Sequence, residues 1–457
     1  MTSAIKTDHY TATQNACNLC APLGAALVFK GIANTVPLLH GSQGCSTYIR
    51  RYMISHFKEP LDIACSNFGE ETAIFGGGAN IKLAIDNIRK QYSPDLIGIA
   101  TTCLSETIGD DVPMFIKAYQ HGCRDETLPE LVHVSTPSYQ GTHMQGFHGA
   151  VLALVAALAE PGDGVERPIV NIFPGMVSPS DLRQLRSILE AFGLEVNLTP
   201  DYSDTLNGPL WTEYQRIPEG GTPLSALRRT GSAAATIECG LVLAGEKKTA
   251  GTWLEERFGI ALHRLGLPIG IDQTDLFFQQ LAAISGKPIP EKYSAQRGRL
   301  LDAMVDGHKH FNGVRAALFG EEDLVAGLAG FCSELGIIPV LCATGGGQGR
   351  FKETVKRAVP QRCHDGMQIL EDADFVTIEQ TLEAIDVDLL IGHSKGYTMS
   401  RRLKRPLIRV GFPVHDRVDG SRMLHLGYRG AQQLFDRIAN TLIEEKQKKN
   451  VIGYTYY

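Results

Sequence analysis

The chain has 457 residues, more than one hydrophobic core usually organises, and this length predicts two or three domains. Hydrophobic residues make up 43% of the sequence and charged residues 21%, which is typical of a soluble globular protein and excludes a disordered or fibrous one. The formal net charge is −6 and no Lys/Arg-rich block occurs, so composition and charge argue against nucleic acid or an anionic membrane as partners.

The start of the sequence lacks the basic residues and the apolar run of a signal peptide, and no stretch approaches the ~20 apolar residues of a membrane span. We therefore expect a cytoplasmic protein. In a reducing compartment its ten cysteines are not expected to form disulfides. Buried hydrophobic positions, metal ligands and reactive thiols remain as their candidate roles.

Short apolar, β-branched runs alternate with helix-like segments, which predicts parallel sheets covered by helices. The first group has expected strands at 95–102 and 130–137. Its expected helices lie at 81–91 and from about Gly146 onward. We assign this group to an N-terminal domain of residues 1–164.

The second group follows the turn-rich segment EPGDG at 160–164 and has the expected strands PIVNIFPG, LEVNLTP and SAAATIECG. The third opens near Gly313, with the expected strands RAALFG, IIPVLCAT, DFVTIE, DLLIGHS and PLIRVGFP. We expect a middle domain at 165–312 and a C-terminal domain at 313–457. The predicted fold class is α/β, with three Rossmann-like domains whose mostly parallel sheets are flanked by helices.

Ligands in open α/β sheets gather beyond the carboxyl ends of the strands. Cys103 directly follows the strand IGIATT, Ser138 follows LVHVSTP, and the segment GHSKG at 392–396 follows DLLI. A turn after any strand also favours Gly and Ser for local reasons. The Gly-rich segment 345–349 follows a strand too, but it lacks the GxGxxG order and predicts a flexible turn rather than a nucleotide loop.

Three cysteines are candidate ligands: Cys20 in CNLCAPLGAAL, Cys45 in LLHGSQGCSTYIRR and Cys103 in IGIATTCLSETIGDD. Zinc is disfavoured, because the CxxC of Cys17 and Cys20 has no second CxxC or HxxxH partner at zinc-finger spacing. The spacing also differs from a ferredoxin-type run, so separate loops would have to assemble any iron–sulfur cluster. Three thiolates leave such a cluster half covered, which indicates a shared site with a partner subunit.

A single cysteine is more often a buried hydrophobic residue than a ligand. We keep this structural interpretation for the seven remaining cysteines: Cys17, Cys65, Cys123, Cys239, Cys332, Cys342 and Cys363. Cys17 stays open, because it precedes Cys20 by three residues and could reach the same cluster in another redox state.

The segments above, together with FGGG, HVSTPSYQG, PLIRVGFPVHDR and LGYRGAQQL, resemble the β subunit of nitrogenase component 1 over nearly the whole chain. The resemblance implies that Cys20, Cys45 and Cys103 bind a P-cluster, with Tyr48 beside it and Ser138 as a ligand of its oxidised form. It implies an [8Fe-7S] cluster, or a simpler [4Fe-4S] cluster, shared with a homologous α subunit in an α2β2 heterotetramer. Catalysis would then take place on an iron–sulfur cofactor in the α subunit, with no catalytic residue in this chain.

The resemblance also places Phe75 on the docking surface for an ATP-hydrolysing homodimeric iron protein. No GxxxxGK[ST] motif occurs in the sequence, so ATP hydrolysis is assigned to that separate protein. Glu59, Asp302 and Asp306 match carboxylates that bind a divalent metal between two β subunits. The spacing of four puts both aspartates on one helix face, and carboxylate oxygens suit calcium, magnesium or iron(II). Without the resemblance, the two aspartates are an ordinary solvated helix face.

Three functions share this scaffold: dinitrogen reduction, assembly of the nitrogenase cofactor, and carbon–sulfur reduction by enzymes such as methylthio-alkane reductase. The chain has few residues before Cys20, unlike the molybdenum nitrogenase β subunit, and its middle segment (PDYSDTLNGP to SAAATIECG) is more similar to the assembly scaffold. The complete set of three cysteines and Ser138 instead favours multi-electron delivery. We therefore expect an oxidoreductase subunit, with methylthio-alkane reductase as the preferred enzyme, the assembly scaffold as the alternative and nitrogenase proper third. A metal-free interaction subunit would leave the three cysteines unexplained.

Overall fold

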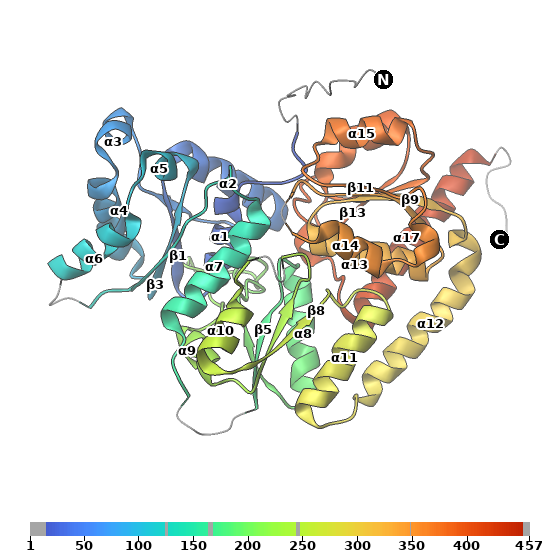
Figure 1. The fold of residues 1–457 in the computed structure, drawn as a ribbon, viewed down its shortest axis with the longest axis horizontal. Helices are drawn as coiled ribbons and strands as arrows, with labels where there is room; N and C mark the ends of the chain where they lie inside the picture. The colour runs from blue at the N-terminus through green and yellow to red at the C-terminus, as the bar shows by residue number, and fades with distance from the viewer. Residues whose placement is uncertain (1–14, 124–126, 163–167, 244–246, 348, 451–457) are drawn as a thin grey trace, which may run out of the picture.

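Three lobes, each built around one sheet, meet at a common centre (Figure 1). The computed structural model describes five stretches of the chain: 15–123, 127–162, 168–243, 247–347 and 349–450. All paired strands within the three sheets run parallel. The predicted α/β class with three parallel sheets flanked by helices is confirmed.

The first lobe has a four-stranded sheet in the order β2-β1-β3-β4. Its strands are β1 (Thr35–His40), β2 (Ala64–Cys65), β3 (Leu96–Thr101) and β4 (Glu130–Val134). The helices that accompany them are α2 (Gln43–Phe57), α3 (Glu70–Phe75), α4 (Gly78–Tyr92), α5 (Cys103–Ile108) and α6 (Val112–Gly122). Both β1 and β3 are buried along their whole length, as expected of parallel strands covered on two faces.

Two further helices of this lobe, α1 (Ala21–Lys30) and α7 (His143–Leu158), pack closely on each other. Every residue of α1 is buried. A Cβ on Gly24 would lie 1.8 Å from the carbonyl oxygen of His143, and a Cβ on Gly146 would lie 1.9 Å from that of Ala21. The two backbones therefore touch, and only glycine fits at either position.

The middle lobe has the strand order β6-β5-β7-β8, with β5 (Ile169–Phe173), β6 (Glu195–Leu198), β7 (Ala235–Cys239) and β8 (Ala261–Leu265). Its helices are α8 (Pro179–Ala191), α9 (Leu224–Arg228), α10 (Ala250–Phe258), α11 (Asp272–Ser285) and α12 (Glu291–Phe311). Ser178 and Asp181 cap α8 reciprocally, which fixes where this helix begins. The long α12 runs along the outer side of the molecule (Figure 1).

The third lobe has a five-stranded sheet in the order β11-β10-β9-β12-β13. The strands are β9 (Arg315–Phe319), β10 (Ile338–Ala343), β11 (Gln368–Leu370), β12 (Leu389–Gly392) and β13 (Leu407–Arg409). The helices are α13 (Glu322–Glu334), α14 (Phe351–Ala358), α15 (Phe375–Glu383), α16 (Tyr397–Leu403) and α17 (Gly427–Lys449). Helix α17 packs on α12 and so joins this lobe to the middle one.

The expected strand DFVTIE is wrong, because this segment begins helix α15. The Asp374 side chain accepts a hydrogen bond from the Thr377 amide at 2.8 Å, which is the N-cap arrangement that starts a helix. Phe375, Ile378 and Leu382 are buried at helical spacing. The β-branched residues suggested a strand, but the cap and the period of the apolar residues decide the structure.

Each of the three sheets lies within one of the expected domain ranges. The boundary between 164 and 165 falls outside the described residues. The boundary after Asn312 lies between the end of α12 and the start of β9 and stays a prediction.

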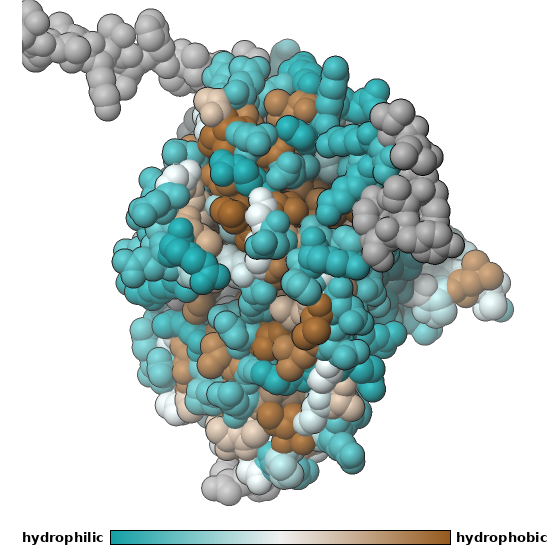
Figure 2. Space-filling view, turned by 90° about the vertical axis from the view of Figure 1, so that its right-hand side faces the viewer, coloured by the Kyte–Doolittle hydropathy of each residue, from teal (hydrophilic) through white to brown (hydrophobic). Residues whose placement is uncertain are grey.

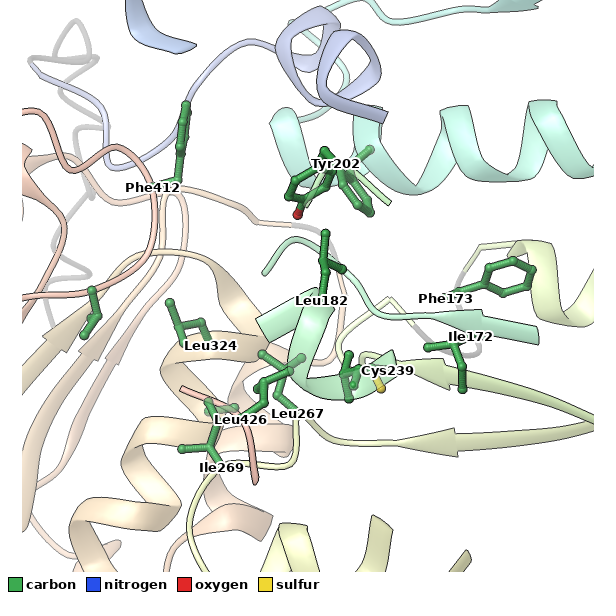
Figure 3. Packing of buried hydrophobic residues seen from close by; sticks show 14 of the residues in the cluster. Ile172, Phe173, Leu182, Tyr202, Cys239, Leu267, Ile269, Leu324, Phe412 and Leu426 are labelled. Atoms are coloured by element: carbon green, nitrogen blue, oxygen red, sulfur yellow. The ribbon is translucent and has the colours of Figure 1, made fainter. Parts of the chain in front are cut away.

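Buried hydrophobic residues from all three lobes form one continuous core (Figure 3). Tyr202 of the middle lobe, one of the largest fully buried side chains, donates its hydroxyl to the Val177 carbonyl at 2.6 Å. Phe57 of α2 and Phe412 of the third lobe lie 6.0 Å apart between ring centroids, and Phe57 also contacts the Tyr202 ring. Because this core is shared, the lobes hold one another in place. Among the helices in the described parts of the chain, none combines the length and apolar character needed to span a membrane.

Candidate functional site

Three neighbouring strands of the first lobe deliver candidate ligands to one edge of the sheet. Strand β3 pairs with β1 on one side and with β4 on the other. Cys45 lies just after β1, Cys103 immediately after β3, and Ser138 after β4. The carboxyl ends of parallel strands meet at one edge, so the three loops converge there. The sequence predicted such positions for Cys103 and Ser138, whereas β1 was not among the expected strands.

Hydrogen bonds join Cys20 and Ser138 to the same edge. The Ser138 amide donates to the Cys103 sulfur at 3.3 Å, and the amide of Ala21 donates to the Ser138 hydroxyl at 3.2 Å. The backbone of Cys20 forms an isolated antiparallel bridge with Thr142, the residue that caps α7. The contacts between α1 and α7 thus bring Cys20 to the loops that follow the sheet.

All three cysteines lie at helix N-termini. Cys20 is the N-cap residue of α1, Cys103 is the first residue of α5, and Cys45 lies in the first turn of α2. The positive end of the helix dipole favours a negatively charged sulfur at these positions.

The pKa of the Cys20 thiol is raised. Surrounding protein atoms desolvate its thiolate even though the residue as a whole is exposed, and the neighbouring Cys103 and Cys45 act in the same direction. The hydrogen bond with Ser138 acts in the opposite direction. The influence of Cys103 and Cys45 on Cys20 agrees with the convergence of the loops at one edge of the sheet, and a bound cation would replace the proton of Cys20.

The donor set fits an iron–sulfur cluster shared with a second chain. Cys20 and Cys103 are exposed and Cys45 is partly exposed, so the thiols face the surface of this chain rather than its core. Thiolates are the ligands that hold such clusters. Within the described residues, no group of three His, Cys, Asp or Glu side chains is arranged to bind a single metal ion.

Tyr48 lies on α2 one turn after Cys45 and is half exposed. Its hydroxyl is 3.0 Å from that of Tyr52, and the two rings pack edge to face. Burial raises the pKa of Tyr52 to about 12, and the Tyr48 hydrogen bond and the Cys20 thiol contribute in the same direction. Tyr52 therefore belongs to the surroundings of Cys20, although the sequence singled out only Tyr48.

Cys17 is buried, and its sulfur lies 3.7 Å from Nε2 of His393 in the third lobe. Burial raises the pKa of this thiol strongly, so it is a neutral thiol in the isolated chain. The other cysteines with a structural interpretation are buried or half-buried: Cys65, Cys123, Cys239, Cys332, Cys342 and Cys363.

Phe75 ends the short helix α3 and is 85% exposed, next to Ile74, which is 75% exposed. The following loop is held rigidly, because the Gly77 amide donates to both carboxylate oxygens of Asp110 at 3.1 Å. Asp110 also binds Nε2 of the buried His40 at 3.0 Å. A fixed loop thus presents two large apolar side chains to solvent, which is typical of a docking surface.

Asp302 and Asp306 are exposed on α12, beside the exposed Leu301 and Val305. Figure 2 shows this side of the molecule, where separate hydrophobic patches lie within a mostly hydrophilic surface. Glu59 follows α2 of the first lobe, whereas both aspartates lie on α12 of the middle lobe, and desolvation raises the pKa of Glu59. One chain therefore does not bring the three carboxylates together, and a site formed by two copies stays a prediction.

The sequence of residues 20–443 matches the family described as nitrogenase component 1 type oxidoreductase. The chain is 35% identical to a nitrogenase molybdenum-iron protein beta chain of Clostridium pasteurianum, over 95% of this chain and 94% of that protein. It is 34% identical to a vanadium-iron protein beta chain of Trichormus variabilis, over 98% of both chains. It is also 33% identical to the cofactor biosynthesis protein NifN of Bradyrhizobium diazoefficiens, over 96% of this chain and 92% of NifN.

Solved structures agree with these sequence comparisons. A chain of the structure titled "Nitrogenase Cp1 at pH 6.5" superposes with a TM-score of 0.94 at 33% identity and covers 98% of both chains. A chain of "Nitrogenase Cp1 at pH 5" shares the fold with a TM-score of 0.71 at 16% identity, over 94% of this chain and 89% of that one. The sequence match and the superposition extend over nearly the full length, so the protein belongs to the nitrogenase component 1 oxidoreductases, as a β-type subunit.

Proposed function

We propose that this chain is the β-type subunit of a nitrogenase-like reductase and that it relays electrons to a catalytic iron–sulfur cofactor in a homologous α subunit. Cys20, Cys45 and Cys103 would hold an [8Fe-7S] P-cluster together with ligands from that subunit. The observation that carries the proposal is the convergence of three thiols and Ser138 on one exposed edge of a sheet. When bound, such a cluster accepts and releases electrons at a potential set by charge, solvent exposure and hydrogen bonds to its sulfurs.

The residues of this chain have distinct tasks in that relay. The helix N-termini behind Cys20 and Cys103 stabilise anionic sulfur, and the Ser138 amide holds the Cys103 sulfur. The Ser138 hydroxyl oxygen accepts a hydrogen bond from the Ala21 amide, which holds this oxygen beside Cys20. If this oxygen becomes an iron ligand on oxidation, it releases its proton, and electron transfer is then coupled to proton transfer.

Partners follow from the same geometry. The exposed thiols support an α subunit as partner, and the exposed Leu301 and Val305 beside Asp302 and Asp306 support a contact between two β copies in an α2β2 assembly. A divalent metal held by these aspartates and Glu59 of the second copy is part of the proposal. An ATP-hydrolysing iron protein would dock near Phe75. We also propose a cytoplasmic location for the complex, because ATP and reductant are available there.

Among reactions, we propose reductive carbon–sulfur cleavage of the methylthio-alkane reductase type. The complete cysteine set with Ser138 supports electron delivery, whereas the scaffold-like middle segment separates the chain from nitrogenase proper. The similarity to NifN supports cofactor assembly as the second candidate. The molybdenum and vanadium nitrogenase relatives, at 32–37% identity, support dinitrogen reduction as the third candidate.

Iron quantification and electron paramagnetic resonance (EPR) on the anaerobically co-purified complex test the proposal. About eight irons per αβ interface, EPR-silent with dithionite and paramagnetic after stepwise oxidation, are expected for the P-cluster. About four irons with a reduced S = 1/2 signal would contradict it and support the assembly scaffold. Carbon–sulfur cleavage is then assayed with a methylthio-alkane substrate, the complex and its iron protein. Absence of that reaction from an eight-iron complex would reject the substrate but not the electron relay.

The variant Ser138→Ala is expected to leave the iron content unchanged and to alter the EPR spectrum of the oxidised complex. Alanine removes the hydroxyl oxygen but keeps the backbone amide that binds the Cys103 sulfur. Ser135→Ala is the matched control, because this hydroxyl lies three residues earlier in the same loop and binds Glu106 at 2.6 Å instead. An oxidised spectrum identical to wild type in Ser138→Ala would remove Ser138 from the ligand set.

The variant Phe75→Ala is expected to slow electron transfer from the iron protein by raising the concentration needed for half-maximal rate about tenfold. A large apolar side chain at an interface centre commonly contributes ~1–3 kcal/mol to binding. Leu83→Ala on α4 is the control, since Leu83 is also well exposed but has no assigned role. The half-saturating concentration is measured in single-turnover mixing. Equal values for both variants would show that Phe75 is not at the docking site.

A further inference from the structure

Residues 15–20 form a strap that crosses from the third lobe to α1 and ends at Cys20 (Figure 1). Its first half is bound to the start of α15. Ala16 pairs with Asp374 in an antiparallel bridge, and the Cys17 amide donates to the Ala373 carbonyl at 3.2 Å. The ligand Cys20 is therefore tied to a lobe that contributes no ligand of its own.

The second half of the strap is bound to α7. The Leu19 amide donates to Nδ1 of the buried His143 at 3.2 Å, and the His143 amide donates to the Leu19 carbonyl at 2.9 Å. The Cys20 backbone bridges to Thr142 next to it. Between these two attachments, the strap depends on its contacts with the third lobe.

Lys395 makes the central contact. It lies in the turn after β12, and its ammonium group donates to the Ala16 carbonyl and, at 3.3 Å, to the Asn18 carbonyl. The Asn18 side-chain amide in turn donates to the Gly345 carbonyl at 2.5 Å. A Cβ on Gly345 would lie 2.5 Å from the Cys17 carbonyl carbon. The Gly-rich loop after β10 therefore packs directly against the backbone of the strap.

The Lys395 ammonium brings a positive charge to the strap. It donates to the carbonyls of Ala16 and Asn18, and Asn18 lies two residues before Cys20. Both of these carbonyl partners are neutral groups.

Resting on the proposed cluster function, we propose that Lys395 is a positioning residue for Cys20 and the source of positive charge behind this ligand. It fixes the strap through two backbone carbonyls and stabilises the more reduced, more negative state of whatever cluster Cys20 binds. Removal of the charge lowers the reduction potential, because potentials of such clusters follow local net charge and hydrogen bonding.

The test compares wild type, Lys395→Met and Lys395→Arg in the co-purified complex by EPR-monitored redox titration. At a fixed potential, the oxidised-to-reduced ratio in Lys395→Met is expected to rise roughly tenfold, which corresponds to 59 mV for one electron. Lys395→Arg keeps the charge and is expected to stay near wild type. Lys58→Met is the matched control, because Lys58 also donates to two backbone carbonyls, those of Ser55 and His415, but at an exposed position. A wild-type ratio in iron-replete Lys395→Met, or an equal shift in Lys58→Met, overturns the proposal.

Hydrogen–deuterium exchange on the metal-free full chain tests the positioning role of Lys395 without a bound cluster. The amides of Cys17 and Leu19 are hydrogen-bonded in the strap, and in Lys395→Met they are expected to exchange about tenfold faster. Unchanged exchange at both amides overturns the positioning role. A wild-type complex without iron would defeat the proposed function, and this exchange measurement would still decide whether Lys395 positions the strap.

Discussion

The variant Cys45→Ala is expected to lose most of the iron at the subunit interface and to lower reductase activity by more than about tenfold. Cys45 lies in the first turn of α2, where its sulfur accepts a hydrogen bond from the Ser42 hydroxyl at 3.8 Å. Alanine removes the thiolate without disturbing the helix, since alanine is the best helix former. The loss thus reports on ligation rather than on folding.

Iron content, EPR and co-purification of the α subunit measure this effect. Cys123→Ala is the control, because Cys123 is half-buried in the same lobe and has a structural interpretation. We expect the control to retain its iron and its partner. Full iron content in Cys45→Ala would reject the ligand assignment and, with it, the shared cluster.

The convergence of Cys103 and Ser138 could be anticipated from sequence, because each follows a short apolar run of the kind that forms a parallel strand. Cys45 follows β1, a strand that was not among those expected. Parallel strands end at one edge, so a correct strand assignment already places such residues near one another. Cys20 was harder to place, since it precedes α1 rather than following a strand. Its position depends on the packing of α1 on α7, which no local pattern reveals.

Contacts between distant segments explain what the sequence did not show. Lys395 and Ala16 are separated by 379 positions and His393 and Cys17 by 376, so no spacing rule connects either pair. The segment GHSKG drew attention only as a turn after a strand. Tyr52 was missed for a different reason: it lies one helical turn beyond Tyr48 and had no signal of its own beyond that spacing.

Local signals can also mislead when two of them compete. DFVTIE has the β-branched residues of a strand, yet Asp374 caps a helix there and the apolar residues repeat at helical spacing. A short run satisfies both patterns, and the longer segment through Leu382 is needed to separate them. The start of this helix also fixes the strap, because the Ala373 carbonyl accepts a hydrogen bond from the Cys17 amide.

The contact between α1 and α7 predicts the second large effect: Gly146→Ala is expected to destabilise the chain by about 2 kcal/mol or more and to displace Cys20. A Cβ at this position would lie 1.9 Å from the Ala21 carbonyl oxygen, directly after Cys20. Backbone cannot give way as a flexible side chain can, and overpacking of this kind costs about 1–3 kcal/mol. The strain exceeds the ~1 kcal/mol that alanine contributes to helix stability relative to glycine.

Gly149→Ala on the same helix is the matched control. Its Cβ would lie 3.5 Å from a Val134 methyl group, an ordinary contact, so only the gain in helix propensity of about 0.5–1 kcal/mol remains. We therefore expect opposite shifts in the midpoint of thermal unfolding, with loss of iron in Gly146→Ala alone. Equal midpoints for the two variants would show that α1 and α7 can separate without cost. The position of Cys20 would then have to be set by the strap and Lys395 instead of by the helix pair.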